Sequence, residues 1–185
     1  MLRLRQAAFM GRDCLLVYRA DSARTVRWLP GALEAMLLLQ RSGHELIMVI
    51  DQPGLATGQV RSDAHWAWAA AVRLQLHDVG IRLAGMLLCP HDPDGHVAPY
   101  NIACECRKPA PGLLLRAAKN LNLNLGNSVM FAADETDLAR GQRAGVSQLV
   151  WIQAGGQQHW VGRTLVSPTL LEAVQTLRRG PLDAV

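Results

Sequence analysis

The chain contains 185 residues, of which 50% are hydrophobic and 18% charged, a composition that excludes an intrinsically disordered protein and allows a sizeable core. The net charge of +4 comes from 17 arginines and 2 lysines scattered among 15 acidic residues; with so few aromatic residues for base stacking, it does not indicate a nucleic acid partner. Charged or polar residues interrupt every apolar stretch before the ~18 residues that a membrane span needs, so we expect no membrane partner.

The N-terminal segment begins the series of predicted elements. A basic start, residues 2–5, precedes an apolar stretch, residues 7–10, that is shorter than the about 7 to 15-residue core of a signal peptide. We therefore expect a cytoplasmic protein whose first strand covers residues 7–10. Residues 11–13 follow as a turn, and residues 14–18 either extend the strand or form a hairpin.

The rest of the chain alternates between helical and strand patterns. A helix over 30–39 has proline and glycine in its first turn, and a strand over 45–50 follows. A helix over 62–79 carries Trp66 and Trp68, which cannot share a face at this spacing, so one belongs to the core and the other to the surface. The remaining elements are a strand over 83–88, a helix over 111–120, a strand over 129–133, a helix over 136–144, a strand over 148–152 and a last helix, capped by Ser167 and Pro168, that ends at Leu177.

This alternation predicts an α/β fold, in which helices flank a central parallel sheet within one domain over residues 1–185. Ligands of such sheets lie beyond the carboxyl ends of the strands. The candidate functional segments are therefore residues 11–13, 50–52, 89 and 133–137. Five histidines have no partner at a recognisable spacing, and we expect them to be solvated: His44, His65, His77, His96 and His159.

Three of the four cysteines gather with a histidine on one loop. Cys89, His91, Cys104 and Cys106 have the composition of a closed tetrahedral zinc site, and without an export signal such a cluster favours a metal over disulfides. The loop has little apolar surface, so zinc would staple it into shape as a structural ion with no open position for water. The alternative is that the thiols are buried and free and that the histidine is solvated.

Four ordered segments carry a resemblance to a known family. The most specific is CPHDPDGHVAPYNIACECRKPAPG at residues 89–112, and the others are LPGALEAMLLL at 29–39, DQPGLATG at 51–58 and SVMFAADETDLARGQRAGV at 128–146. Together they resemble the bacterial D-glycero-D-manno-heptose 1,7-bisphosphate phosphatases and histidinol-phosphate phosphatases of the haloacid dehalogenase (HAD) superfamily. The resemblance implies a Rossmann-like HAD fold without a large cap domain, with a zinc-stapled loop over residues 89–106.

The first catalytic motif of this family reads DRDG. Its first aspartate attacks phosphorus, and its second protonates the leaving oxygen and then activates water. The matching residues here put Gly11 at the nucleophile position and Asp13 at the acid/base position. Glycine has no side chain to attack with, and a one-residue slip would turn a neighbour to the other face of the strand. Cys14, the nearby thiol, stands where the family has glycine, and we expect it to face away from phosphorus.

The second and third motifs concern phosphate binding. The family's TNQSG corresponds to Ile50, Asp51 and Gln52 here, so the hydroxyl is lost and a carboxylate that would repel phosphate replaces an amide. Gln52 remains a candidate substrate-binding residue. The third motif survives as Arg107 and Lys108, whose cations could neutralise a bound phosphate.

The fourth motif, GDxxxD, implies a magnesium ligand at its first aspartate. That position is Ala133 here, and only Asp137 remains of the pair. Because Mg²⁺ takes oxygen ligands and both principal carboxylate positions, Gly11 and Ala133, are empty, we do not expect Mg²⁺ to bind as it does in the family. The alternative is a backbone shift that would bring Asp134 into the vacant position.

Three functions remain open at this point. The first is a pseudophosphatase, a catalytically impaired or inactive HAD-type homologue that binds an anionic small molecule such as a sugar phosphate, or a protein partner. The second, implied by a family of phosphoric monoester hydrolases in carbohydrate metabolism, is an active phosphatase on a heptose bisphosphate or a related sugar phosphate. The third is a structural protein without a ligand.

Overall fold

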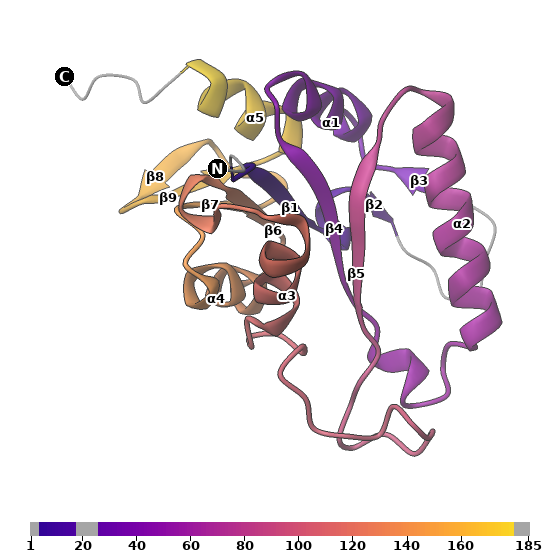
Figure 1. Ribbon diagram of the computed structural model, residues 1–185. Coiled ribbons are helices and arrows are strands. Elements are labelled where there is room, and N and C mark those ends of the chain that lie inside the picture. The colour runs from indigo at the N-terminus through magenta and orange to yellow at the C-terminus, as the bar shows by residue number, and fades with distance from the viewer. Residues whose placement is uncertain (1–3, 18–25, 180–185) are drawn as a thin grey trace.

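A seven-stranded sheet forms the centre of the molecule. The computed structural model describes residues 4–17 and 26–179 (Figure 1), so Tyr18 and residues 2–3 of the basic start lie outside the described residues. The strands, in spatial order, are β5 (Leu83–Cys89), β4 (Glu45–Asp51), β1 (Ala7–Gly11), β6 (Val129–Ala132), β7 (Gln148–Ile152), β9 (Thr164–Ser167) and β8 (His159–Val161). All neighbouring pairs are parallel except β8 with β9, which confirms the predicted mostly parallel sheet.

Helices cover both faces of this sheet. They are α1 (Ala32–Arg41), α2 (Ser62–Asp78) and α5 (Leu170–Arg179) on one face, and α3 (Gly112–Leu121) and α4 (Glu135–Ala144) on the other (Figure 1). Alternate residues of each strand point to opposite faces, so Met10 joins the first cluster of buried side chains and Phe9 the second. The predicted α/β arrangement, with helices flanking the sheet, is therefore confirmed.

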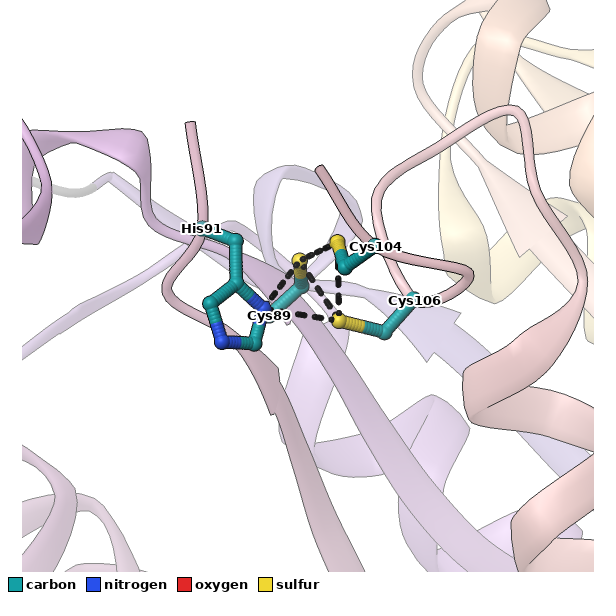
Figure 2. Close-up of side chains that lie close together, drawn as sticks. All are labelled: Cys89, His91, Cys104 and Cys106. Carbon is teal, nitrogen blue, oxygen red and sulfur yellow. Dashed lines mark hydrogen bonds between the residues drawn. The ribbon is translucent and has the colours of Figure 1, made fainter. Parts of the chain in front are cut away.

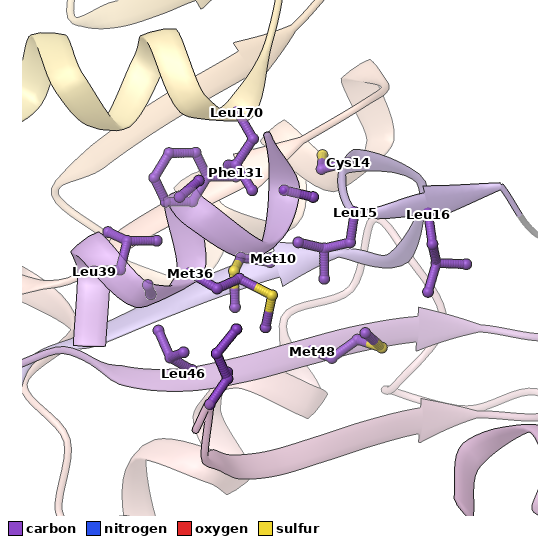
Figure 3. Close-up of a cluster of buried hydrophobic side chains, with 14 of the residues drawn as sticks. Met10, Cys14, Leu15, Leu16, Met36, Leu39, Leu46, Met48, Phe131 and Leu170 are labelled. Atoms are coloured by element: carbon purple, nitrogen blue, oxygen red, sulfur yellow. The ribbon is translucent and has the colours of Figure 1, made fainter. Parts of the chain in front are cut away.

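The central strands are apolar along their whole length because both of their faces are covered. β1 is buried at every residue, and β4 is buried at all positions but its two ends. Figure 3 shows the larger cluster, in which Met36 of α1 lies beside Met10 of β1. This core fixes the carboxyl ends of β1 and β4, on which the candidate site is built.

Of the two alternatives for residues 14–18, extension of β1 is wrong and antiparallel pairing is found: after a 3-10 turn over Arg12–Cys14, β2 (Leu16–Val17) pairs antiparallel with β3 (Arg27–Trp28). One predicted cap is corrected. The last helix is not capped by Ser167, which ends β9. Thr169 caps it instead, since its hydroxyl oxygen accepts a hydrogen bond from the Glu172 amide at 3.2 Å. The strands β8 and β9 themselves were not predicted.

The side chains of α2 divide as its periodicity predicts, with one exception. Trp68 is buried and Trp66 is 60% exposed, which confirms that one tryptophan belongs to the core. His65, expected to be solvated, is only 2% exposed and packs against both rings. His44 is also half-buried, with its Nδ1 atom shielded from solvent, whereas His77, His96 and His159 are exposed. None of the described helices combines the length and hydropathy that a membrane span requires.

Buried His65 is expected to make the protein less stable in mild acid. Burial, assisted by Arg12, lowers the pKa of His65 from its usual 6.5, so the unfolded chain takes up a proton that the folded protein does not. The free energy of unfolding should therefore fall as the pH drops below about 6.5, and a His65→Gln variant should show a smaller fall. Urea unfolding at pH 7.5 and 5.5 measures this difference. His77→Gln, on the exposed side of α2, is the matched control, and an equal effect of the two variants would contradict the prediction.

Candidate active-site cleft and metal cluster

A small cleft opens beyond the carboxyl ends of β1 and β4. Its volume is about 150 Å³, and the polar side chains that line it come from five segments: Arg12, Asp13, Asp51, His91, Arg107, Lys108 and Asp137. Most of the residues that the motifs single out thus meet in one place. Gln52 is not among the lining residues; it is 5% exposed, and its Nε2 atom has no hydrogen-bond partner among the described residues.

The end of β1 places Gly11 and Asp13 at the cleft. A Cβ atom at Gly11 would lie 3.5 Å from Asp137 Oδ2, an ordinary van der Waals contact, so a side chain there would begin beside that carboxylate. The Asp13 side chain is 54% exposed, and its Oδ1 lies 2.9 Å from Arg12 Nε. Asp13 is therefore the accessible carboxylate of this motif.

Cys14 belongs to the core, and its thiol is poorly suited to attack a substrate. The side chain is 1% exposed and joins the larger apolar cluster (Figure 3). Burial raises its pKa well above the usual value, and the nearby carboxylates of Asp137 and Asp13 raise it further. The thiol therefore stays protonated at neutral pH, and a protonated thiol is a weak nucleophile.

Lys108 is bound to two carboxylates of the fourth motif. Its Nζ atom donates to Asp134 and, at 3.0 Å, to Asp137 Oδ2. Burial alone would lower the pKa of Lys108, but the two carboxylates outweigh it and raise that pKa above its usual value. The ammonium group thus stays charged among the acidic residues of α4.

Arg140 is the central residue that the sequence interpretation missed. Its side chain is fully buried, and its two terminal nitrogens lie 2.7 Å from the two carboxylate oxygens of Asp51. It also donates to Asp137 Oδ1 at 3.0 Å. The carboxylate of Asp51, expected to repel phosphate, is thus neutralised. The helical period could have revealed Arg140, because it falls on the stripe of α4 that also carries the buried Gly141 and Ala144.

The carboxylates of the fourth motif do not fit a magnesium site. Both oxygens of Asp137 accept hydrogen bonds from cations, Lys108 and Arg140. Asp134 caps α4, since its Oδ1 accepts from the Asp137 amide at 3.0 Å and from the Thr136 hydroxyl at 2.6 Å. Moving Asp134 into the Ala133 position would break this cap, so the described residues do not offer Mg²⁺ the free oxygen ligands that it needs.

The two arginines at the rim of the cleft are also paired. Arg107 lies 2.6 Å from Asp92 Oδ1, and its side chain is 40% exposed. Arg12, whose side chain is 16% exposed, is paired with the more exposed Asp13. A fully exposed ion pair contributes only about 0–1 kcal/mol, but one partner of each pair, Arg12 or Asp92, is largely buried, so these pairs are only partly open to solvent.

Next to the cleft, the predicted cysteine and histidine residues form a cluster. Figure 2 shows the side chains of Cys89, His91, Cys104 and Cys106 pointing toward one another, with all ligand atoms within 4.8 Å. The sulfur atoms are 3.0 to 3.7 Å apart, and His91 Nδ1 lies 3.1 Å from Cys106 Sγ. With metal–sulfur bonds of about 2.3 Å, the corners of a tetrahedral site are about 3.8 Å apart, so the sulfur atoms would need to move apart by less than about 1 Å to hold an ion. All four cysteines are free, and the cluster fits a metal ion.

Comparisons with known proteins agree with the family that the sequence motifs indicate. No family model matches the chain. The D-glycero-beta-D-manno-heptose-1,7-bisphosphate 7-phosphatase of Yersinia pestis is 33% identical over 129 residues, which cover 70% of this chain and 69% of the relative. The chain belongs to this phosphatase family. A heptose bisphosphate phosphatase of Pasteurella multocida is 31% identical over 158 residues, covering 82% of this chain and 84% of the relative.

Solved structures similar to this heptose bisphosphate phosphatase homologue have the HAD fold. A HAD-like phosphatase from Mesorhizobium loti is 27% identical, with a TM-score of 0.78, over 94% of this chain and 88% of its own. The D,D-heptose 1,7-bisphosphate phosphatase of B. bronchiseptica, complexed with magnesium and phosphate, has a TM-score of 0.77 at 23% identity and covers 94% and 98% of the two chains. The family and fold implied by the sequence motifs are therefore confirmed.

Proposed function

We propose that this protein is a pseudophosphatase: a HAD-type homologue, acting in the cytoplasm as a single domain, that binds a phosphorylated sugar without hydrolysing it. The observation that carries the proposal is Gly11, which ends β1 where the family motif has its nucleophile. The two neighbouring groups do not replace it, because Asp13 lies two residues on and the Cys14 thiol is buried in the core. Without a nucleophile, an aspartyl phosphate cannot form.

The charges of the cleft support binding of a phosphate group without a divalent cation. Lys108 and Arg140 neutralise the acidic side chains, a role that Mg²⁺ would otherwise have. The side chain of Arg107 is 40% exposed at the rim, so an incoming dianion can compete with Asp92 for its guanidinium group. The cleft is smaller than the roughly 300–1,000 Å³ of pockets that enclose a drug-sized ligand, and its size suits a phosphoryl group whose sugar remains outside.

We further propose that the metal cluster holds one structural zinc ion. Three thiols and one imidazole favour zinc over magnesium or calcium, which prefer oxygen ligands. When bound, zinc supplies a tetrahedral cross-link between the end of β5 and the segment before α3. It thereby holds Arg107 and Lys108, which directly follow Cys106, at the cleft.

A phosphate-release assay tests the proposal. We expect no release above background from heptose bisphosphate or from a panel of other sugar phosphates, with or without Mg²⁺. The same compounds should raise the melting temperature of the zinc-loaded protein, because a ligand at a hundred times its Kd adds about 2.7 kcal/mol. Turnover at the rate of the related phosphatases would contradict the proposal, and so would the absence of any thermal shift.

A double replacement, Gly11→Asp with Ala133→Asp, sharpens this test. It restores both carboxylates that the family motifs place at these positions, and a Cβ atom at Gly11 would make only ordinary van der Waals contacts. We expect the variant to bind Mg²⁺, measurable by calorimetry, because two further carboxylates exceed what Lys108 and Arg140 can neutralise. Any phosphate release that accompanies Mg²⁺ binding would identify these two positions as the ones that prevent hydrolysis.

The second candidate function is an active heptose bisphosphate phosphatase. The identity of 33% to a curated phosphatase favours it, and so does the retained Asp13 at the acid/base position. It requires a nucleophile other than the side chains at positions 11 and 14. Phosphate release from the wild-type protein that an Asp13→Asn variant abolishes would establish this function in place of the first.

A further inference from the structure

The metal cluster and the cleft share a set of hydrogen bonds. The main-chain carbonyl of Cys89 accepts a hydrogen bond from the backbone amide of Gln52 at 2.8 Å. The carbonyl of His91 accepts from Arg107 at 3.3 Å, and that of Cys106 from Arg140 at 3.1 Å. Three of the four metal-binding residues are thus bonded through their backbone to residues in or beside the cleft.

Arg140 connects the two sites most directly. The same guanidinium group that binds the Cys106 carbonyl also binds both carboxylate oxygens of Asp51 and donates from Nε to the Ala110 carbonyl at 3.3 Å. Asp51 in turn accepts from the backbone amide of Lys108 at 3.1 Å. The segment from Cys106 to Ala110, which carries both cations of the third motif, is therefore held at one end by the metal ligand and along its length by the Arg140–Asp51 pair.

We propose that metal occupancy of the cluster and phosphate affinity of the cleft are thermodynamically coupled, with Arg140 as the positioning residue that links them. A metal ion that fixes the side chains of Cys89, His91 and Cys106 also fixes their carbonyls, and these place Arg107 and Arg140. This inference rests on the proposed function, which makes the cleft a phosphate-binding site.

The coupling must act in both directions. If zinc strengthens phosphate binding by some factor, phosphate strengthens zinc binding by the same factor. Coupling between sites is typically 5 to 150-fold, and we expect roughly tenfold here because three hydrogen bonds, two of them charge-assisted, join the sites.

Two titrations measure this factor. Calorimetry gives the Kd of inorganic phosphate for the zinc-loaded and the zinc-depleted protein. Competition with a chromophoric zinc chelator gives the zinc affinity of the loaded protein with and without phosphate, at ionic strength matched with sodium chloride. We expect a tenfold change in each. The chelator competition begins from the folded, loaded protein, so it tests the coupling even if the zinc-depleted form unfolds.

Two variants test whether Arg140 itself links the metal cluster to the cleft. Asp51→Asn with Arg140→Met removes the link while leaving the net charge unchanged, and it should bring the factor close to one. Gln142→Met, on the exposed side of the same helix, is the control and should keep the wild-type factor. Zinc affinity that is independent of phosphate would overturn the coupling, and a factor that persists in the double variant would overturn the role of Arg140. If phosphate does not bind the zinc-loaded protein at all, the proposed function fails with it, whereas binding without coupling overturns this inference alone.

Discussion

An Arg140→Met variant is expected to lose about 3–5 kcal/mol of unfolding free energy, because it leaves the buried carboxylate of Asp51 without its counter-charge. The side chains of Asp51 and Asp137 are only 12% and 10% exposed, and Arg140 donates to both; Asp137 would keep Lys108. Among the described residues, Asp51 would keep one hydrogen-bond partner, the backbone amide of Lys108. Urea unfolding of both proteins at pH 7, analysed as a two-state transition, measures the loss.

A second replacement should recover much of this loss. Adding Asp51→Asn to Arg140→Met removes the uncompensated charge, and exchanging a buried ion pair for neutral groups of similar size is often neutral in stability. Arg143→Met serves as the control and should change the free energy of unfolding by no more than about 0.5 kcal/mol. If the double variant is no more stable than Arg140→Met alone, the network does not have the electrostatic role assigned to it.

Loss of the metal cluster is the second change with a large expected effect. A Cys106→Ser variant should bind no zinc and should lose at least about 4 kcal/mol of unfolding free energy, since a structural metal contributes directly to folding. For a domain of this size, that corresponds to a fall in melting temperature of about 10 °C or more. Elemental analysis and calorimetry of the purified variants measure the two quantities.

Cys14→Ala is the matched control for the cluster. Cys14 is also buried, but it lies in the apolar core outside the metal ligands, so its replacement should leave about one zinc per chain. Its cost should be limited to the loss of packing around one sulfur atom. A Cys106→Ser protein that retains zinc, or a wild-type protein whose melting temperature is unaffected by a chelator, would contradict the zinc assignment.

The parts of the fold that could be predicted are those that bury both faces of a strand. Residues 46–50 and 149–152 are continuous apolar runs, and the strands that contain them begin and end within one residue of the prediction. The strands β8 and β9 gave a weaker signal because they have only three and four residues. β8, at the edge of the sheet, is exposed at all three residues, whereas three residues of β9 are buried.

The residues of the candidate site could be predicted where they lie close together in the sequence or belong to a known motif. The cysteines and His91 gather within one loop, and Asp13, Arg107 and Lys108 belong to recognisable motifs. The Arg140–Asp51 pair was not predictable in this way, because its partners are 89 residues apart and meet only after the sheet and α4 have packed. The burial of His65 likewise depends on how α2 lies on the sheet.

The position of β5 at the edge of the sheet indicates how this protein would aggregate. β5 is the outermost strand on its side of the sheet, carries no charged residue, and ends at the metal-binding residue Cys89. One row of its backbone donors and acceptors faces away from β4, and an edge strand without charged residues can pair with a strand of another molecule. The proposed zinc ion would anchor the end of that strand. We expect the zinc-depleted protein to aggregate through β5 more readily once it has unfolded on heating, so that zinc would protect the solubility of the protein as well as its shape.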